Sequence, residues 1–182
     1  MGLDGLRVPP ASIQKALNDE LEKRFALPSL VVAIEEVDVY LDLKAIEGKK
    51  LDPAVVRRAA ATFLRTLPEL QTAIARDDVG TTDPFGLGRA LSNSFHPERS
   101  GDVLMVMKPF HVLESEKGGT SHGTPWSYDS DVPIFLFGKG VKPGVYASTV
   151  HPTDVAPTMS AILEMGAPAS NEGVVLFEAL TK

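Results

Sequence analysis

Cysteine is absent from this sequence of 182 residues, which excludes disulfide bridges and thiolate metal sites. No apolar run approaches the ~18 residues of a membrane-spanning helix, and the first ten residues lack the apolar core of a signal peptide. Basic residues form no patch and the net charge is −6, so no nucleic acid partner is expected. What is present, 43% hydrophobic and 23% charged residues, is typical of a globular domain with a sizeable core.

Two hydrophobic periodicities alternate along the first two thirds of the chain. Alternating apolar and polar residues predict strands, and apolar residues three or four apart predict helices. After an N-terminal helix the order is β-β-α-β-α-β, which indicates an α+β subdomain on a mixed or antiparallel sheet. The predicted helices span 12–25 and 53–67, with another starting at Asp83-Pro84, and the predicted strands span 30–35, 37–43, 70–75 and 103–107.

Capping residues mark the expected helix boundaries. Ser12, Asp52 and Thr153 are the predicted N-caps of three helices. Gly166 is expected just beyond the end of the last helix, where a glycine tolerates a left-handed backbone. The apolar residues of that last helix predict a buried stripe, formed by Val155, Met159, Ile162 and Leu163.

Residues 118–138 carry the most informative pattern. Their first half is polar and rich in glycine, which predicts a loop, and His122 lies there between small residues where a ligand can approach closely. Their second half, Val132–Phe137, is continuously apolar and predicts a strand buried on both faces, as in a parallel sheet. From spacing alone, His122 is either a ligand at a site beside this strand or a solvated loop side chain.

Three segments, taken in order, resemble those of one enzyme family. Residues 97–103 resemble a segment leading into an earlier strand, residues 119–138 resemble the last metal-ligand motif, and residues 153–158 resemble the start of the closing helix. The family is the alkaline phosphatase superfamily. Within it, the sequence is most similar to secreted, zinc-dependent bacterial alkaline phosphatases related to type I phosphodiesterases and nucleotide pyrophosphatases. Order and spacing agree over roughly residues 10–178.

The resemblance implies an α/β fold, of which this chain holds a partial domain, and phosphate ester hydrolysis with two zinc ions and a Thr or Ser nucleophile. Only His122 maps onto a metal ligand of the family; the nucleophile motif and the Asp-His pair of the second metal have no counterpart here. The chain is therefore expected to be the C-terminal portion of a phosphomonoesterase or phosphodiesterase, starting from an added or internal Met and inactive alone. The whole protein is expected to be periplasmic or secreted.

We expect three parts: a flexible lead over 1–10, the α+β subdomain over 11–113, and the metal-ligand loop, core strand and closing helix over 114–182. Two alternative functions remain open. One is a non-catalytic binding or scaffold module with a phosphatase-like fold. The other is a stand-alone hydrolase whose single metal is held by His122, Asp129, Asp131 and another histidine.

Other polar and aromatic residues have a structural interpretation beside the functional one. Asp38 and Asp42 form either a carboxylate pair or a solvated strand face, and the latter is favoured. Trp126 and Tyr128 either line a pocket or anchor the loop on the core, and anchoring is favoured. The same preference for a structural role applies to the remaining histidines and to the arginines of the second helix, namely His96, His111, His151, Arg57, Arg58 and Arg65.

The absent part of the family's sheet leads to an expectation about association. In the family the strand matching Val132–Phe137 lies in a large central sheet, so here it would lack neighbours and expose its apolar side chains. The isolated chain is then expected to self-associate, most simply as a two-fold dimer, through this strand or the helix over 153–165. The alternative is that the N-terminal helix folds over the exposed face.

Overall fold

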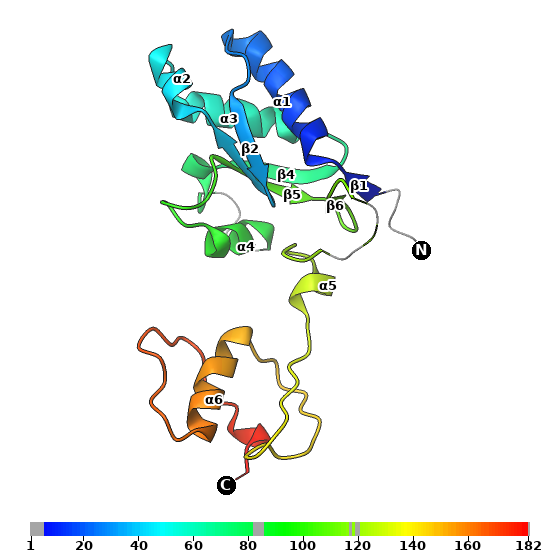
Figure 1. Cartoon of the computed structure of the whole chain (residues 1–182), viewed down its shortest axis with the longest axis vertical. Helices are drawn as coiled ribbons and strands as arrows, with labels where there is room; N and C mark the ends of the chain where they lie inside the picture. Colours follow the sequence, from blue (N-terminus) through cyan, green and yellow to red (C-terminus); the bar gives the residue numbers. More distant parts are fainter. Residues whose placement is uncertain (1–5, 82–85, 117, 119–120, 182) are drawn as a thin grey trace. The chain divides into compact units, whose positions relative to one another are not determined.

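The computed structural model describes residues 6–81, 86–116, 118 and 121–181. The chain divides into two compact units, an N-terminal unit over Met1–Asp131 and a C-terminal unit over Val132–Lys182 (Figure 1). The N-terminal unit holds the sheet and most of the buried hydrophobic residues. Among the described residues, no helix is long and apolar enough to cross a bilayer.

The N-terminal unit is built on a four-stranded antiparallel sheet in the order β2-β3-β5-β4. Its strands are β2 (Val31–Glu35), β3 (Asp38–Leu41), β4 (Leu70–Ala75) and β5 (Val103–Met107). This confirms the predicted strands and the antiparallel alternative. The two edges are β2 and β4, and the backbone of Val31 at the β2 edge is bonded to side chains of helix α1 (Pro10–Phe25): Gln14 Nε2 donates to its carbonyl at 2.9 Å and its N–H donates to Asn18 Oδ1 at 2.8 Å.

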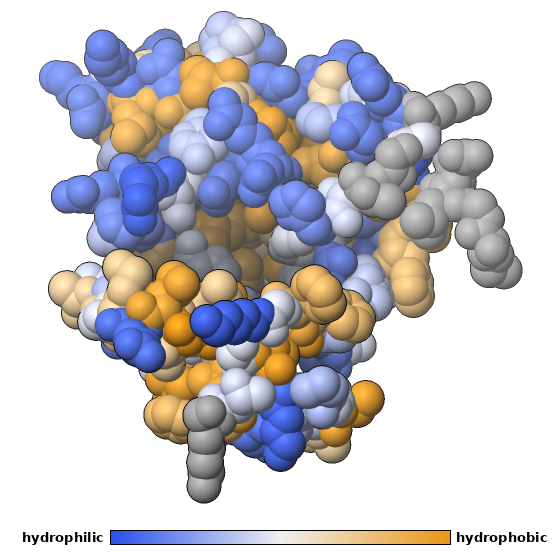
Figure 2. Space-filling model, turned by 60° about the horizontal axis from the view of Figure 1, so that its bottom comes forward, coloured by the Kyte–Doolittle hydropathy of each residue, from blue (hydrophilic) through white to orange (hydrophobic). Residues whose placement is uncertain are grey.

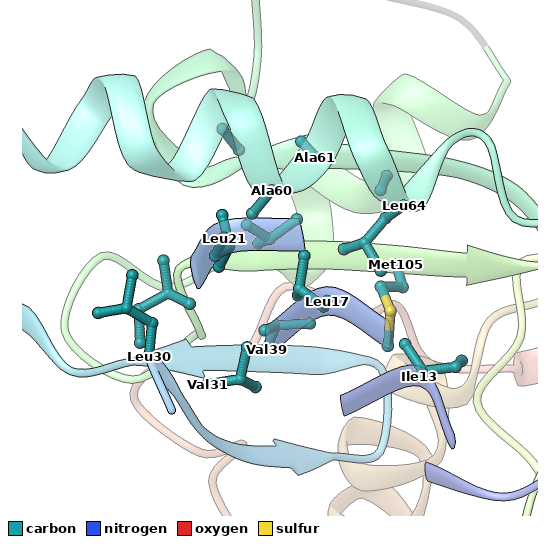
Figure 3. Packing of buried hydrophobic residues seen from close by; sticks show 14 of the residues in the cluster. Ile13, Leu17, Leu21, Leu30, Val31, Val39, Ala60, Ala61, Leu64 and Met105 are labelled. Carbon is teal, nitrogen blue, oxygen red and sulfur yellow. The ribbon is translucent and has the colours of Figure 1, made fainter. Parts of the chain in front are cut away.

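Helices α1 and α3 (Pro53–Leu64) cover one face of the sheet and form the main core with it. Figure 3 shows Leu17 and Leu21 of α1 among the side chains of α3 and the strands. Both leucines are fully buried, which matches the four-residue spacing seen in the sequence. Val55 is an apolar residue of α3 that does not face the core: it is 50% exposed, whereas the adjacent Val56 is fully buried.

On the opposite face of the sheet, a smaller hydrophobic cluster is formed with residues of α4 (Leu87–Ser94). Leu104 and Val106 of β5 belong to this cluster, while Val103, Met105 and Met107 face the main core. Because β5 is central and covered on both faces, all five of its residues are buried. Met105 and Met107 are thus core side chains.

The helix starts follow the capping predictions in part. Asp52 is the N-cap of α3 and its side chain accepts from the Ala54 N–H at 2.9 Å, which confirms the prediction. The Ser12 N-cap is wrong, because α1 begins two residues earlier at Pro10, where a proline needs no hydrogen-bond partner. The start predicted at Asp83-Pro84 lies outside the described residues.

Helix α2 (Leu43–Gly48) was not predicted, because Leu43 was assigned to the end of the second strand. Asp42 ends that strand: it caps α2 by accepting from the Ala45 N–H at 3.0 Å. The shorter elements of this unit are the parallel pair β1 (Arg7–Val8) and β6 (Val112–Leu113), the 3-10 turn η2 (Arg76–Asp78) and the single-turn helix α5 (Ser127–Ser130).

The C-terminal unit contains helix α6 (Val155–Ile162), which follows the 3-10 turn η3 (Pro152–Asp154), and a last turn η4 (Phe177–Ala179). Asp154, not Thr153, is the N-cap of α6, and Glu164, not Gly166, has the left-handed backbone after the helix, with φ 54°. The predicted buried stripe is also wrong: Met159 and Leu163 are 42% and 60% exposed. The buried residues of α6 are Pro157 and Thr158.

The predicted strand over Val132–Phe137 is wrong: none of its residues is in a strand, and Phe135 and Phe137 are 88% and 104% exposed. Residues 145–150 are also outside any strand, and Val145 is 101% exposed. A strand buried on both faces needs neighbouring strands and covering helices. No strand is described in this unit apart from one isolated bridge between Val141 and Leu180.

Candidate functional site

The candidate site is the His122 loop, which we define as residues 121–131. Trp126 fastens it to the sheet, because its indole Nε1 donates a hydrogen bond to the backbone carbonyl of Met107 at 3.0 Å. The indole also packs against the smaller core cluster. The loop is therefore fixed at the end of the central strand β5. This is the anchoring role favoured for Trp126 from the sequence.

Two further contacts make the loop rigid. Asp129 Oδ2 accepts from both the backbone N–H and the hydroxyl of Thr124, at 3.0 and 2.6 Å, and so closes the segment that follows His122. The Tyr128 ring stacks on Phe110 with a centroid distance of 5.0 Å, and the Tyr128 hydroxyl accepts from the Phe110 N–H at 3.0 Å. Tyr128 therefore also anchors the loop instead of lining a pocket.

His122 itself is exposed at the open end of this loop, and within the described residues its imidazole makes no hydrogen bond or ion pair. Gly123 follows with φ 88°, and its missing Cβ would meet no atom within 4 Å. One accessible neutral imidazole fits one ligand position of a zinc ion, which ordinarily takes four ligands.

The other expected ligands are not gathered around His122. No group of three or more His, Asp or Glu side chains that is able to hold a metal occurs in the part of the chain that is described. The Asp129 carboxylate instead accepts a hydrogen bond from the Thr124 hydroxyl. The mononuclear site of His122, Asp129, Asp131 and a second histidine is therefore not assembled by these residues.

Two of the remaining histidines have local structural roles, as expected. The His96 Nδ1 accepts from the Glu98 N–H at 3.2 Å within a turn. The His111 Nδ1 lies 3.1 Å from the Pro109 carbonyl. His151 is exposed, and its backbone N–H donates to the Asp154 carboxylate at 2.8 Å.

The side chains of Arg57, Arg58 and Arg65 are bonded to other groups of the protein, so they do not form an open anion-binding site. Arg57 donates to both carboxylate oxygens of Asp77, at 2.6 and 2.8 Å, and to Asp102 at 3.2 Å. This pairing lowers the pKa of Asp77. Arg58 pairs with Asp78 at 2.9 Å, and Arg65 donates to the Ala73 carbonyl at 3.1 Å.

Asp102 was not among the candidate residues from the sequence, yet it is the most buried carboxylate of this network, with 4% of its surface exposed. Its Oδ2 accepts from the Leu41 N–H at 2.9 Å. The side chain thus continues the hydrogen bonding along β3 past Val103, the first residue of β5. Asp38, half-buried in β3, is less well compensated: its Oδ1 is buried without a hydrogen-bond partner among the described residues, and burial raises its pKa although a backbone hydrogen bond from Gly101 acts in the opposite direction. Asp38 and Asp42 therefore do not act as a pair.

Comparison with known proteins gives this arrangement a context. No family model matches the chain. The alkaline phosphatase PafA of Elizabethkingia meningoseptica is 28% identical over 169 residues, which are 92% of this chain and 31% of PafA. The crystal structure of PafA matches with a TM-score of 0.84 over 93% of this chain and 33% of that chain. This chain has the fold of part of an alkaline phosphatase.

Two further relatives match this chain over a similar share of its length. The alkaline phosphatase PhoK of a Sphingomonas species is 28% identical over 176 residues, covering 89% of this chain and 31% of PhoK. A Myroides odoratus protein named as a calcium-transporting ATPase is 30% identical over 171 residues, covering 93% of this chain and 31% of that protein. The chain thus spans about a third of the length of the curated relatives that it matches.

Proposed function

We propose that this chain is part of a metal-dependent phosphate ester hydrolase and that His122 is one of its zinc ligands. The observation that carries the proposal is the match to proteins named alkaline phosphatases along about nine tenths of this chain, in sequence and in structure. An exposed imidazole on a loop fastened to the central strand supports the assignment of His122. The finer proposal is a phosphomonoesterase or phosphodiesterase of the group related to nucleotide pyrophosphatases, in the periplasm or outside the cell.

The contribution of this chain to the chemistry is the position of one neutral nitrogen donor. A pair of zinc ions in the complete enzyme would supply positive charge to the attacking and leaving oxygens of phosphoryl transfer, with His122 as one ligand. His122 binds a metal only while its imidazole is unprotonated. The Trp126–Met107 and Asp129–Thr124 hydrogen bonds hold the loop in place, so less flexibility is lost when the imidazole takes up its ligand position.

The isolated chain is proposed to bind zinc weakly and to turn over no substrate. A single imidazole is one of about four ligands that a zinc ion requires, and no other potential ligands converge on it in the described residues. Assayed alone with a chromogenic phosphate monoester and excess zinc, the chain should show no hydrolysis above the buffer rate. Chelator-sensitive turnover by the isolated chain would overturn this and would revive a stand-alone site.

The test of the His122 assignment uses a chimera in which this chain replaces the matched third of PafA. His122→Ala should lower its zinc content and its hydrolysis rate together. His96→Ala is the matched control, because that histidine acts only within a turn. If the His122 variant keeps full zinc and full rate, the assignment fails. The non-catalytic module then becomes the better description, since the described residues assemble no metal site of their own.

A further inference from the structure

The His122 loop has two halves that are held in different ways. The later half is fastened to the sheet and its flank, because Trp126 donates to the Met107 carbonyl and the Tyr128 hydroxyl accepts from the Phe110 N–H, both at 3.0 Å. These contacts lie within the N-terminal unit. The shape of the loop therefore does not depend on the exposed apolar side chains of the C-terminal unit, which Figure 2 shows gathered on the face turned to the viewer.

The earlier half of the loop, residues 121–123, has no such fastening. All three residues are exposed, and no hydrogen bond among the described residues involves them. Gly123 has a left-handed backbone with φ 88°, and the position that its Cβ would take meets no atom within 4 Å. The imidazole of His122 is therefore connected to the fastened half through the next residue, Thr124.

Thr124 is held by one carboxylate of the fastened half. Asp129 lies in α5, where its N–H donates to the Trp126 carbonyl at 2.9 Å. Its Oδ2 accepts from the Thr124 N–H at 3.0 Å and from the Thr124 hydroxyl at 2.6 Å. A carboxylate accepts stronger hydrogen bonds than a neutral oxygen does. Because the two bonds fix both the backbone and the side chain of Thr124, they set the direction in which the chain runs towards His122.

We propose that Asp129 is the positioning residue for His122 and that it acts through Thr124, whereas Trp126 serves the stability of the loop. This inference rests on the proposed function, in which His122 is a zinc ligand. Residues that hold a metal ligand in place typically contribute about 10–100-fold to the affinity for the metal. In this role Asp129 is not itself a ligand, because its Oδ2 is already bonded to Thr124.

Zinc affinity of the PafA chimera, measured by competition with a chromogenic chelator, tests the role of the carboxylate. Asp129→Ala should weaken zinc binding about tenfold. Asp129→Asn keeps an oxygen that accepts both bonds, so it should recover most of the affinity and match Asp131→Asn, which makes the same change of charge two residues away. Equal losses for Asp129→Ala and Asp129→Asn would overturn the proposal, because Asp129 would then act through its charge or as a ligand.

Thr124→Val tests whether Asp129 acts through the threonine. It removes the hydroxyl and keeps the shape of the side chain, so it should weaken zinc binding as well. The double variant with Asp129→Ala should bind no more weakly than Asp129→Ala alone, since both changes break the same contact. Losses that multiply in the double variant would contradict a shared route.

A measurement without metal separates this inference from the proposed function. In the metal-free chain, Asp129→Ala should speed hydrogen exchange of the Thr124 amide about tenfold, while Asp131→Asn should leave it unchanged. Unchanged exchange in Asp129→Ala would overturn the positioning role. If His122→Ala weakens zinc binding by the chimera but Asp129→Ala does not, the positioning role fails and the ligand assignment stands. If His122→Ala has no effect on zinc, both fail.

Discussion

The Trp126 indole N–H donates to the carbonyl of Met107 at 3.0 Å and so links the His122 loop to the last residue of β5. Met107 is 3% exposed, and its strand is paired on both sides. The one tryptophan of the sequence therefore joins the candidate ligand loop to a strand that is buried along its whole length.

Trp126→Phe should lower the free energy of unfolding of the isolated chain by about 1 kcal/mol, because it removes one partly buried hydrogen bond and keeps most of the ring. Circular dichroism during urea unfolding measures the loss. Tyr128→Phe is the control in the same loop, and its effect should be smaller because the Phe110–Tyr128 bond is exposed. Equal losses in the two variants would contradict the assignment of Trp126 as the main anchor.

Asp102→Ala should destabilise the N-terminal unit by about 2–3 kcal/mol, because it leaves the Leu41 N–H and part of the Arg57 guanidinium without their acceptor in a buried place. Trp126 fluorescence reports on this unit in urea. Asp78→Ala removes an acceptor from the exposed Arg58 and should change stability little. A loss at Asp102 no larger than that at Asp78 would show that the network contributes nothing.

The contributions of Asp38 and Asp77 to the free energy of unfolding should change with pH in opposite directions. Burial raises the folded pKa of Asp38 above 3.8, so its ionisation opposes folding, and that penalty sets in as pH rises past 3.8. The Arg57 guanidinium lowers the folded pKa of Asp77 below 3.8, so its stabilisation is full above 3.8 and is lost as pH falls through the folded pKa.

Asp38→Asn should therefore raise the free energy of unfolding at pH 7, and Asp77→Asn should lower it. Both differences should shrink as the pH falls, that of Asp38 as the pH falls towards 3.8 and that of Asp77 as the pH falls below 3.8 through its lowered folded pKa, since a protonated carboxyl resembles the amide. Urea midpoints at several pH values, followed by Trp126 fluorescence, give the two profiles. Differences of the same sign, or differences that do not change with pH, would refute the interpretation of these two carboxyls.

Thr158→Val should loosen residues 174–176 of the C-terminal unit, because it keeps the side-chain shape but removes the acceptor of the Leu176 N–H. A lost bond of about 1.4 kcal/mol corresponds to roughly tenfold faster exchange of that amide hydrogen. Ser160→Ala is the control on the same helix, since its hydroxyl only donates to the Ala156 carbonyl within α6. Unchanged exchange at Leu176 would mean that Thr158 does not hold this segment.

The N-terminal unit was predictable because its apolar periodicity and its buried faces agree. Ile13, Leu17 and Leu21 recur every four residues and are all buried, and β4 and β5 have the predicted bounds. The match of the fold to part of an alkaline phosphatase also agrees with the resemblance in sequence. Local pattern suffices where a unit contains both of the surfaces that pack together.

The C-terminal unit was less predictable for the opposite reason. Val132–Phe137 has the composition of a doubly buried strand, but within the described residues no other strand pairs with it. The apolar positions of α6 likewise predict a buried stripe, whereas Met159 and Leu163 are exposed. Composition reports the environment for which a segment is suited, and it does not report whether that environment is present. The sequence likewise does not establish the role of His122, because one ligand does not define a metal site.

The side-chain amides of Gln14 and Asn18 have a consequence for solubility. They occupy the carbonyl and the N–H of Val31 at the outer edge of β2. An incoming strand from another molecule would have to displace both before it could add to the sheet there. The N-terminal unit is thereby protected against growth into fibrils at this edge. Amyloid-like stacking provoked by heat or acid should start from residues 132–137, whose backbone has no hydrogen-bond partner in the described part of the chain.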